Sequence, residues 1–69
     1  MEGIEMGEDN YNEKLANYIK KARQIFGYTQ KELAQEAGVS LTTIKRVEAG
    51  EQIPQVYTLN LILNVLGRS

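Results

Sequence analysis

The 69-residue sequence contains no cysteine and no histidine. Without cysteine there can be no disulfide, no thiolate nucleophile and no cysteine-bound zinc. Without histidine the chain lacks the commonest general base and the commonest remaining zinc ligand. Catalytic chemistry and metal binding therefore have little support, and we expect a binding protein that is not an enzyme and that holds no metal and no cofactor.

The sequence also lacks a long hydrophobic run. No apolar stretch approaches the roughly 18 residues that a membrane span requires, and no basic segment leads into an apolar signal core. We therefore expect a cytoplasmic protein without membrane contact. Hydrophobic residues make up 42% and charged residues 25% of the chain, which is typical of a globular protein, and the length suits one small domain with a single core.

The charges are distributed unevenly along the chain. Residues 1–13 carry five acids and no base, a net charge of −5, whereas residues 14–69 carry eight bases and four acids, a net charge of +4. An acidic terminal segment can hide a basic domain when only the total of −1 is considered. We predict that residues 1–10 form a flexible acidic tail and that residues 11–67 form the folded domain.

The first predicted helix begins near Tyr11 and ends at Gly27. Apolar residues in this segment follow one another at spacings of four, three and four, which places them on one face of a helix. They are Leu15, Ile19, Ala22 and Phe26.

The second predicted helix has a strong N-terminal signal. Thr29 followed by Glu32 is a capping box, in which the hydroxyl and the carboxylate each accept from a backbone amide of the first turn. Tyr28 and Leu33 have the spacing of the accompanying hydrophobic staple. The apolar positions run to Ala37, and Gly38 is expected to end the helix.

The third predicted helix follows almost at once. Ser40 is a second cap, Ile44 and Val47 face inward, and Gly50 ends the helix. Two short helices with so little chain between them must cross steeply, as in a helix-turn-helix. One helix or a pair of helices is expected over residues 55–66, and nothing in the pattern is typical of strands. The predicted fold class is all-α, with four or five helices.

The segment from Thr29 to Gly50, TQKELAQEAGVSLTTIKRVEAG, resembles the core of the Cro/CI-type (XRE-like) helix-turn-helix family, which includes the lambdoid phage repressors. The resemblance extends over about residues 15–67. It implies a compact lambda-repressor-like DNA-binding domain. HipB-type antitoxins use the same domain, as do many small bacterial and phage regulators.

The resemblance also implies roles for individual residues. The recognition helix is expected at about residues 41–49, lying in the major groove. The positions that match the family's base-reading sites are Leu41, Thr42 and Arg46. Those expected to contact DNA phosphates are Gln30, Ser40, Thr43 and Lys45. Ser40 is a helix cap in the first place, and ordinary solvated surface is the alternative for Thr43 and Lys45. Arg46 can bond guanine O6 and N7 together, whereas Leu41 replaces the polar residue often found at its position.

Arg23 and Glu48 interrupt inward-facing patterns. By position they match the family's internal ion pair, which joins the first helix to the recognition helix. We interpret this pair as structural.

The last predicted helix is apolar on two sides. Besides the stripe expected to face the core (Val56, Leu59, Ile62, Leu63 and Leu66), it carries a second stripe formed by Tyr57, Leu61 and Val65. A helix that is apolar on both sides is generally buried on both sides. The second stripe is therefore interpreted as a homodimer interface, with scattered surface hydrophobic residues as the alternative.

Two functions remain after these exclusions. The first is a small transcriptional regulator, a repressor in particular, that binds a palindromic double-stranded DNA operator as a homodimer. The alternative is an antitoxin or protein-interaction module whose main partner is another protein, such as a toxin. Salt dependence separates the two, because DNA binding releases counterions and weakens steeply as ionic strength rises.

Overall fold

A computed structural model describes residues 7–67, with side chains from residue 12 onward. Within these residues the chain forms four α-helices joined by turns and loops, and no strand. The helices are α2 (Gly7–Phe26), α3 (Gln30–Ala37), α4 (Leu41–Glu48) and α5 (Val56–Leu66). The predicted all-α fold is confirmed.

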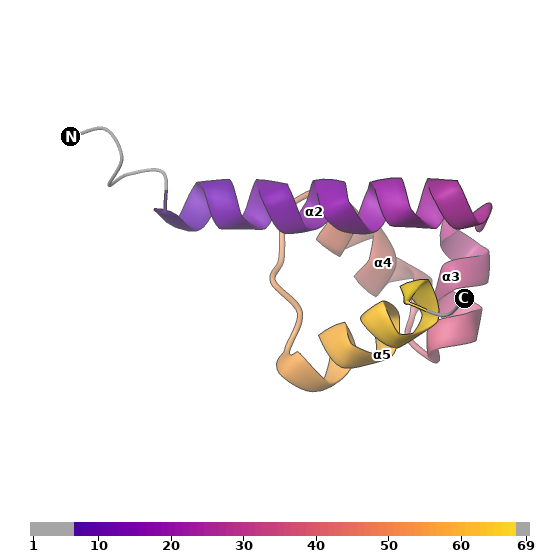
Figure 1. Ribbon diagram of the computed structural model, residues 1–69. Helices are drawn as coiled ribbons and strands as arrows, with labels where there is room; N and C mark the ends of the chain where they lie inside the picture. The colour runs from indigo at the N-terminus through magenta and orange to yellow at the C-terminus, as the bar shows by residue number, and fades with distance from the viewer. Residues whose placement is uncertain (1–6, 68–69) are drawn as a thin grey trace.

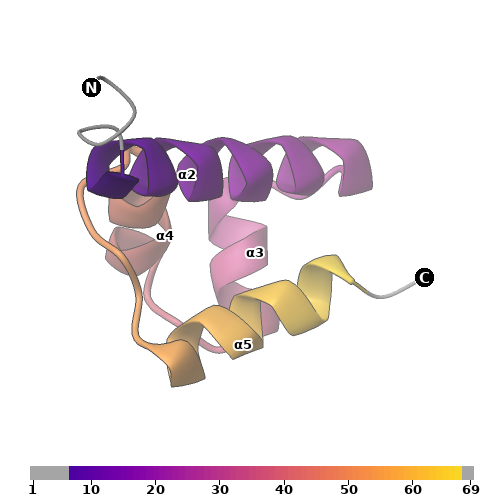
Figure 2. The ribbon, with the colours of Figure 1, turned by 60° about the vertical axis from the view of Figure 1, so that its left-hand side comes forward.

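The helices α3 and α4 lie between the two longer helices. Figures 1 and 2 show α2 along one side of the α3–α4 pair and α5 along the other. Both α2 and α3 pack against α4 and α5. The pair is therefore held from two sides, which fixes the direction in which α4 presents its free face.

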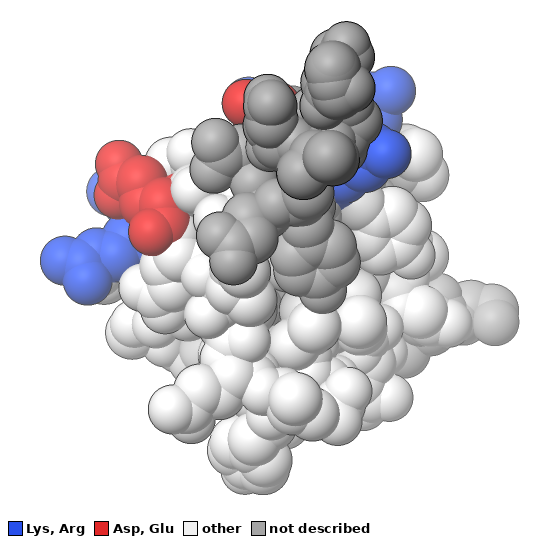
Figure 3. Space-filling view, turned by 90° about the vertical axis from the view of Figure 1, so that its left-hand side faces the viewer, with Lys and Arg blue, Asp and Glu red and all other residues white. Residues whose placement is uncertain are grey.

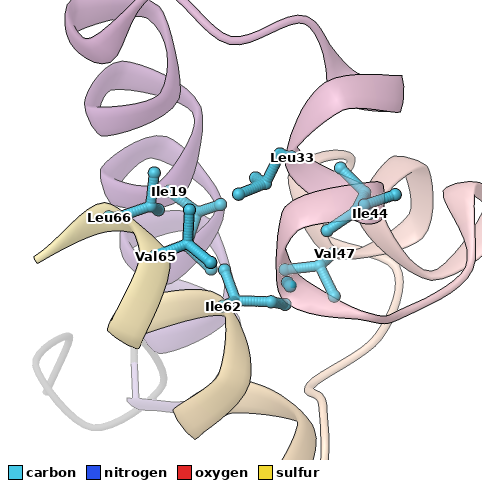
Figure 4. Packing of buried hydrophobic residues seen from close by; sticks show 9 residues of the cluster. Ile19, Leu33, Ile44, Val47, Ile62, Val65 and Leu66 are labelled. Carbon is cyan, nitrogen blue, oxygen red and sulfur yellow. The ribbon is translucent and has the colours of Figure 1, made fainter. Parts of the chain in front are cut away.

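The core draws on all four helices. Nine buried residues form one cluster, and Figure 4 labels the seven larger ones: Ile19, Leu33, Ala34, Ala37, Ile44, Val47, Ile62, Val65 and Leu66. Each fully buried Leu, Ile or Val contributes about 1.5–3 kcal/mol relative to an exposed one. By whole-residue exposure no polar or charged residue among the described ones is buried, so this core cluster is purely hydrophobic.

The helix α2 begins earlier than predicted. It starts at Gly7 rather than near Tyr11, so residues 7–10 of the predicted tail are helical. The rest of the predicted tail, residues 1–6, lies outside the described residues. At the other end, Phe26 was expected to face inward but is 46% exposed.

The helix α5 is a single helix, and its orientation differs from the prediction. Val56 was assigned to the inward stripe, yet it is 74% exposed. Val65 was assigned to the outer dimer stripe, and that prediction is wrong, because Val65 is only 2% exposed and belongs to the core cluster. The physical reason is that α5 carries apolar residues on most of its circumference, so sequence periodicity does not decide which side faces the core.

Candidate DNA-binding surface

The turn between α3 and α4 is closed by backbone hydrogen bonds. Gly38 adopts a left-handed conformation, with φ 75° and ψ 30°. Its amide and that of Val39 both donate to the carbonyl of Ala34, at 2.9 and 3.0 Å. Because Ser40 already caps α4, only residues 38–40 separate the two helices. A short turn of this kind, ended by a left-handed glycine, is what the predicted helix-turn-helix requires.

Both helices of the motif carry the caps that the sequence predicts. The amide of Glu32 donates to Thr29 Oγ1 at 3.0 Å, and the amide of Thr29 donates to Glu32 Oε1 at 2.8 Å, which completes the capping box. At the start of α4 the amide of Thr43 donates to Ser40 Oγ at 3.0 Å. A side-chain cap of this kind stabilises a helix by about 1 kcal/mol.

The helix α4 has one buried face and one free face. Ile44 is fully buried and Val47 is 1% exposed, so these two side chains fix the rotation of the helix about its axis. Thr42 and Arg46, two of the predicted base-reading residues, are exposed on the opposite face. Leu41, the third, is half-buried and packs against the core cluster. The structure therefore leaves only part of Leu41 available to a base.

The free face of α4 also carries two residues that the sequence did not assign to base reading. Lys45 and Ala49 are exposed, at spacings of three and seven from Thr42 that return to the same side of a helix. Lys45 was assigned to phosphates and Ala49 was assigned no role. Lys45, Arg46 and Ala49 follow Thr42 by three, four and seven residues, which is the spacing of one helix face. This spacing is the sequence signal that places Lys45 and Ala49 beside Arg46.

The predicted phosphate-contacting hydroxyls are bonded to each other. Ser40 Oγ and Thr43 Oγ1 are 2.8 Å apart, and either oxygen can be the donor. Two hydroxyls supply two protons, of which this bond uses one. One O–H therefore remains for a ligand at the start of α4.

Gln30 is held by a contact that the sequence did not indicate. Its Nε2 donates to Glu48 Oε1 at 3.1 Å, which joins the start of α3 to the end of α4. The capping box uses the amides of Thr29 and Glu32, so the amides of Gln30 and Lys31 have no partner within the helix. Unpaired amides and the positive end of the helix dipole together favour an anion at this point.

The predicted ion pair between Arg23 and Glu48 is present. Arg23 Nε lies 2.6 Å from Glu48 Oε2, and Nη2 lies 3.1 Å from Oε1, so the contact is bidentate. The third guanidinium nitrogen donates to the carbonyl oxygen of Tyr28 at 2.8 Å. The two side chains are only 12% and 4% exposed. Since Gln30 donates to the same carboxylate, Glu48 joins α2, α3 and α4 at one point.

A different surface surrounds the start of α5. Residues 52–67 contain no charged side chain, and Figure 3 shows the corresponding uncharged lower part of the molecule. Val56 and Tyr57 are each 74% exposed here, and Ile53 is 48% exposed. An adjoining hollow of about 550 Å³ is lined by Tyr57, Asn60, Leu61, Leu63 and Asn64. Of the predicted dimer residues, Tyr57 lies fully on this surface, Leu61 is half-buried and Val65 is in the core.

Two negative findings apply to residues 7–67. No helix there is long and apolar enough to cross a membrane. No three acidic side chains gather into a group that could hold a metal ion in the same residues.

Comparison with known proteins decides the family. A family model described as helix-turn-helix (HTH_3) matches residues 19–69. This chain belongs to the helix-turn-helix family of the Cro/CI (XRE-like) type. The family consists of DNA-binding transcriptional regulators without enzymatic activity, in agreement with the expectation from composition.

One curated relative is similar over most of the chain. It is a protein of Haemophilus influenzae described as an uncharacterized HTH-type transcriptional regulator, 35% identical over 65 residues. The match covers 94% of this chain and 66% of the relative, so the chain spans a little under two thirds of the relative's length. No solved structure matches the chain.

Proposed function

We propose that this protein is a sequence-specific transcriptional regulator, acting as a repressor, that places α4 in the major groove of double-stranded DNA. The observation that carries the proposal is the free face of α4, where Thr42 and Arg46 are exposed while Ile44 and Val47 anchor the opposite side. A groove about 12 Å wide admits one helix. Arg46 would bond a guanine edge in a bidentate manner, which is worth about 1–3 kcal/mol of discrimination.

Phosphate contacts would set the position of α4 without reading bases. The first candidate is the start of α3, where the amides of Gln30 and Lys31 are unpaired within the helix. The second is the spare hydroxyl proton of Ser40 and Thr43 at the start of α4. Because Glu48 holds Gln30 against α4, the first site moves with the reading helix as one rigid unit.

The uncharged surface at the start of α5 supports a homodimer. Val56 and Tyr57 are large, neighbouring and exposed, and no charged residue lies between positions 52 and 67. A two-fold dimer uses the same patch on both copies and needs no charge complementarity. Such a dimer would place its two reading helices about 34–36 Å apart, on successive major grooves of a palindromic operator. Val65 takes no part in this interface.

Selection of binding sites from random double-stranded DNA tests the function. We expect one enriched palindromic motif. Its affinity should fall steeply as salt rises, with a slope of log affinity against log salt concentration of about −0.9 for each phosphate that the protein neutralises. Arg46→Gln should lose the preference at one base pair per half-site while remaining folded. If no motif is enriched, or if Arg46→Gln binds every site as the wild type does, the proposal is wrong and a protein-binding role as in antitoxins gains support.

Sedimentation tests the dimer separately. Val56→Glu/Tyr57→Glu would bury four carboxylates in a two-fold interface and should convert dimers into monomers, because both side chains are exposed in the single chain and the fold does not need them. Tyr18→Glu is the matched control, since Tyr18 is a 59% exposed tyrosine on α2. Equal mass for the double variant and the control would contradict the interface.

A further inference from the structure

The exposed side chains of α4 indicate which bases the helix can recognise, which the helix-turn-helix motif alone does not. Four residues from this helix and its C-cap are exposed and return to one side: Thr42, Lys45, Arg46 and Ala49. We call this set the reading face. The remaining positions of α4 are buried or half-buried.

The geometry of the helix places Lys45 and Arg46 symmetrically on the reading face. Thr42 and Ala49 are seven residues apart and nearly coincide around the axis. Lys45 and Arg46 are adjacent, so about 100° separates them, and each leans about 50° to one side of the line through Thr42 and Ala49. If the reading face enters the groove, both cations therefore point toward the base edges.

The reading face offers donors and methyl groups but almost no acceptors. Lysine and arginine only donate, and alanine has only a methyl group. Thr42 has a methyl group and the single hydroxyl of the set. No carboxylate and no amide stands on this face, so the side chains that usually bond adenine and cytosine amino groups are missing from it.

Base edges that suit such a face are those of guanine and thymine. Guanine presents two acceptors, O6 and N7, in the major groove, and thymine presents the O4 acceptor and a methyl group. We propose that α4 reads a half-site in which the bases facing it are guanines and thymines, with Lys45 and Arg46 each bonding a guanine and with Thr42 and Ala49 contacting thymine methyl groups. This inference rests on the proposed function and assigns Lys45 to a base rather than to a phosphate.

The half-burial of Leu41 agrees with this assignment. Leu41, the first residue of α4, packs against the core cluster. The reading face therefore excludes it and extends from Thr42 to Ala49. Discrimination in this protein therefore depends on Thr42 and on the middle and the end of the helix, rather than on Leu41.

Base analogues in the selected operator test the chemistry directly. We expect two guanines in each half-site, and replacing either with deazaguanine, which lacks the N7 acceptor, should weaken binding roughly tenfold. Uracil in place of the contacted thymines removes only a methyl group and should weaken binding by a smaller factor. An enriched motif without guanine, or full tolerance of deazaguanine, would overturn the inference while leaving sequence-specific binding intact. Failure to enrich any motif would instead remove the proposed function.

The variant Lys45→Met separates base reading from phosphate binding. If Lys45 reads a guanine, the variant should accept other bases at one position and lose roughly tenfold affinity for the original site. If Lys45 contacts a phosphate, all sequences should weaken equally and the salt slope should fall by about one, which would overturn the assignment. Lys20→Met, an exposed lysine on α2, is the control for the loss of one positive charge, and circular dichroism confirms that both variants are folded.

Discussion

Replacing Arg23 with methionine should destabilise this domain more than any single change on its surface. Methionine keeps most of the apolar stem and removes the guanidinium, so Glu48 loses two of the three side-chain donors that reach its carboxylate. The side chain of Glu48 is only 4% exposed, so water cannot easily replace the lost partners. The carbonyl of Tyr28 loses its donor as well.

The expected magnitude follows from the burial of the pair. Breaking a buried ion pair by removing one partner costs about 3–5 kcal/mol. Small proteins unfold with about 0.05–0.15 kcal/mol per residue, or about 3–10 kcal/mol for a chain of 69 residues. In urea, with an m-value near 1 kcal/mol per molar for a small domain, the midpoint should fall by roughly 3–5 M or the transition should vanish. Urea titration followed by circular dichroism measures this shift.

Two variants make the result interpretable. Lys21→Met removes an exposed charge from the same helix and should change the stability by no more than about 0.5 kcal/mol. Arg23→Met/Glu48→Leu removes both partners and should recover much of the loss, because no unpaired charge remains buried. A loss below about 0.5 kcal/mol for Arg23→Met, equal to that of the control, would show that the pair behaves as a surface contact and would refute the reasoning.

Three further predictions concern caps and the core. Ser40→Ala removes the cap of α4 and should cost about 1 kcal/mol in thermal unfolding; an unchanged melting temperature would show that the cap is dispensable. Gly38→Ala meets no atom within 4 Å but must adopt φ +75°, so we expect a loss of about 1 kcal/mol from backbone strain alone, and a stabilised variant would contradict that account. Val65→Glu should prevent folding, whereas Tyr57→Glu should leave the monomer folded, as judged by circular dichroism; equal behaviour of the two would contradict the assignment of Val65 to the core.

Local signals predicted the motif well because they act over a few residues. The capping box at Thr29 and Glu32, the cap at Ser40 and the left-handed Gly38 all form through contacts between near neighbours. Such contacts depend little on the remainder of the fold, so sequence spacing is sufficient to find them.

The rotation of α5 could not be predicted in the same way. Val56 and Val65 were placed on the wrong sides because almost every side of that helix is apolar, and several rotations satisfy the period equally well. Only packing against α2 and α3 selects one of them. The half-burial of Leu41 is also a tertiary effect, since nothing near it in sequence sets how much of it the core covers.

The site was predictable in part. Position within the motif indicated Arg23 and Glu48, and the structure brings them together. The bond from Gln30 to Glu48 spans 18 residues and joins two different helices, so no local pattern indicates it.

In α4 the residues that anchor the helix are separate from those of the reading face, and this separation affects how the protein can change its DNA target. Ile44, Val47 and Glu48 hold the helix in place, and none of them belongs to the reading face. Substitutions on the reading face therefore leave the anchoring contacts untouched. If α4 reads DNA as proposed, changes at these few exposed residues would alter the preferred operator at nearly constant stability, and the same fold would serve different promoters.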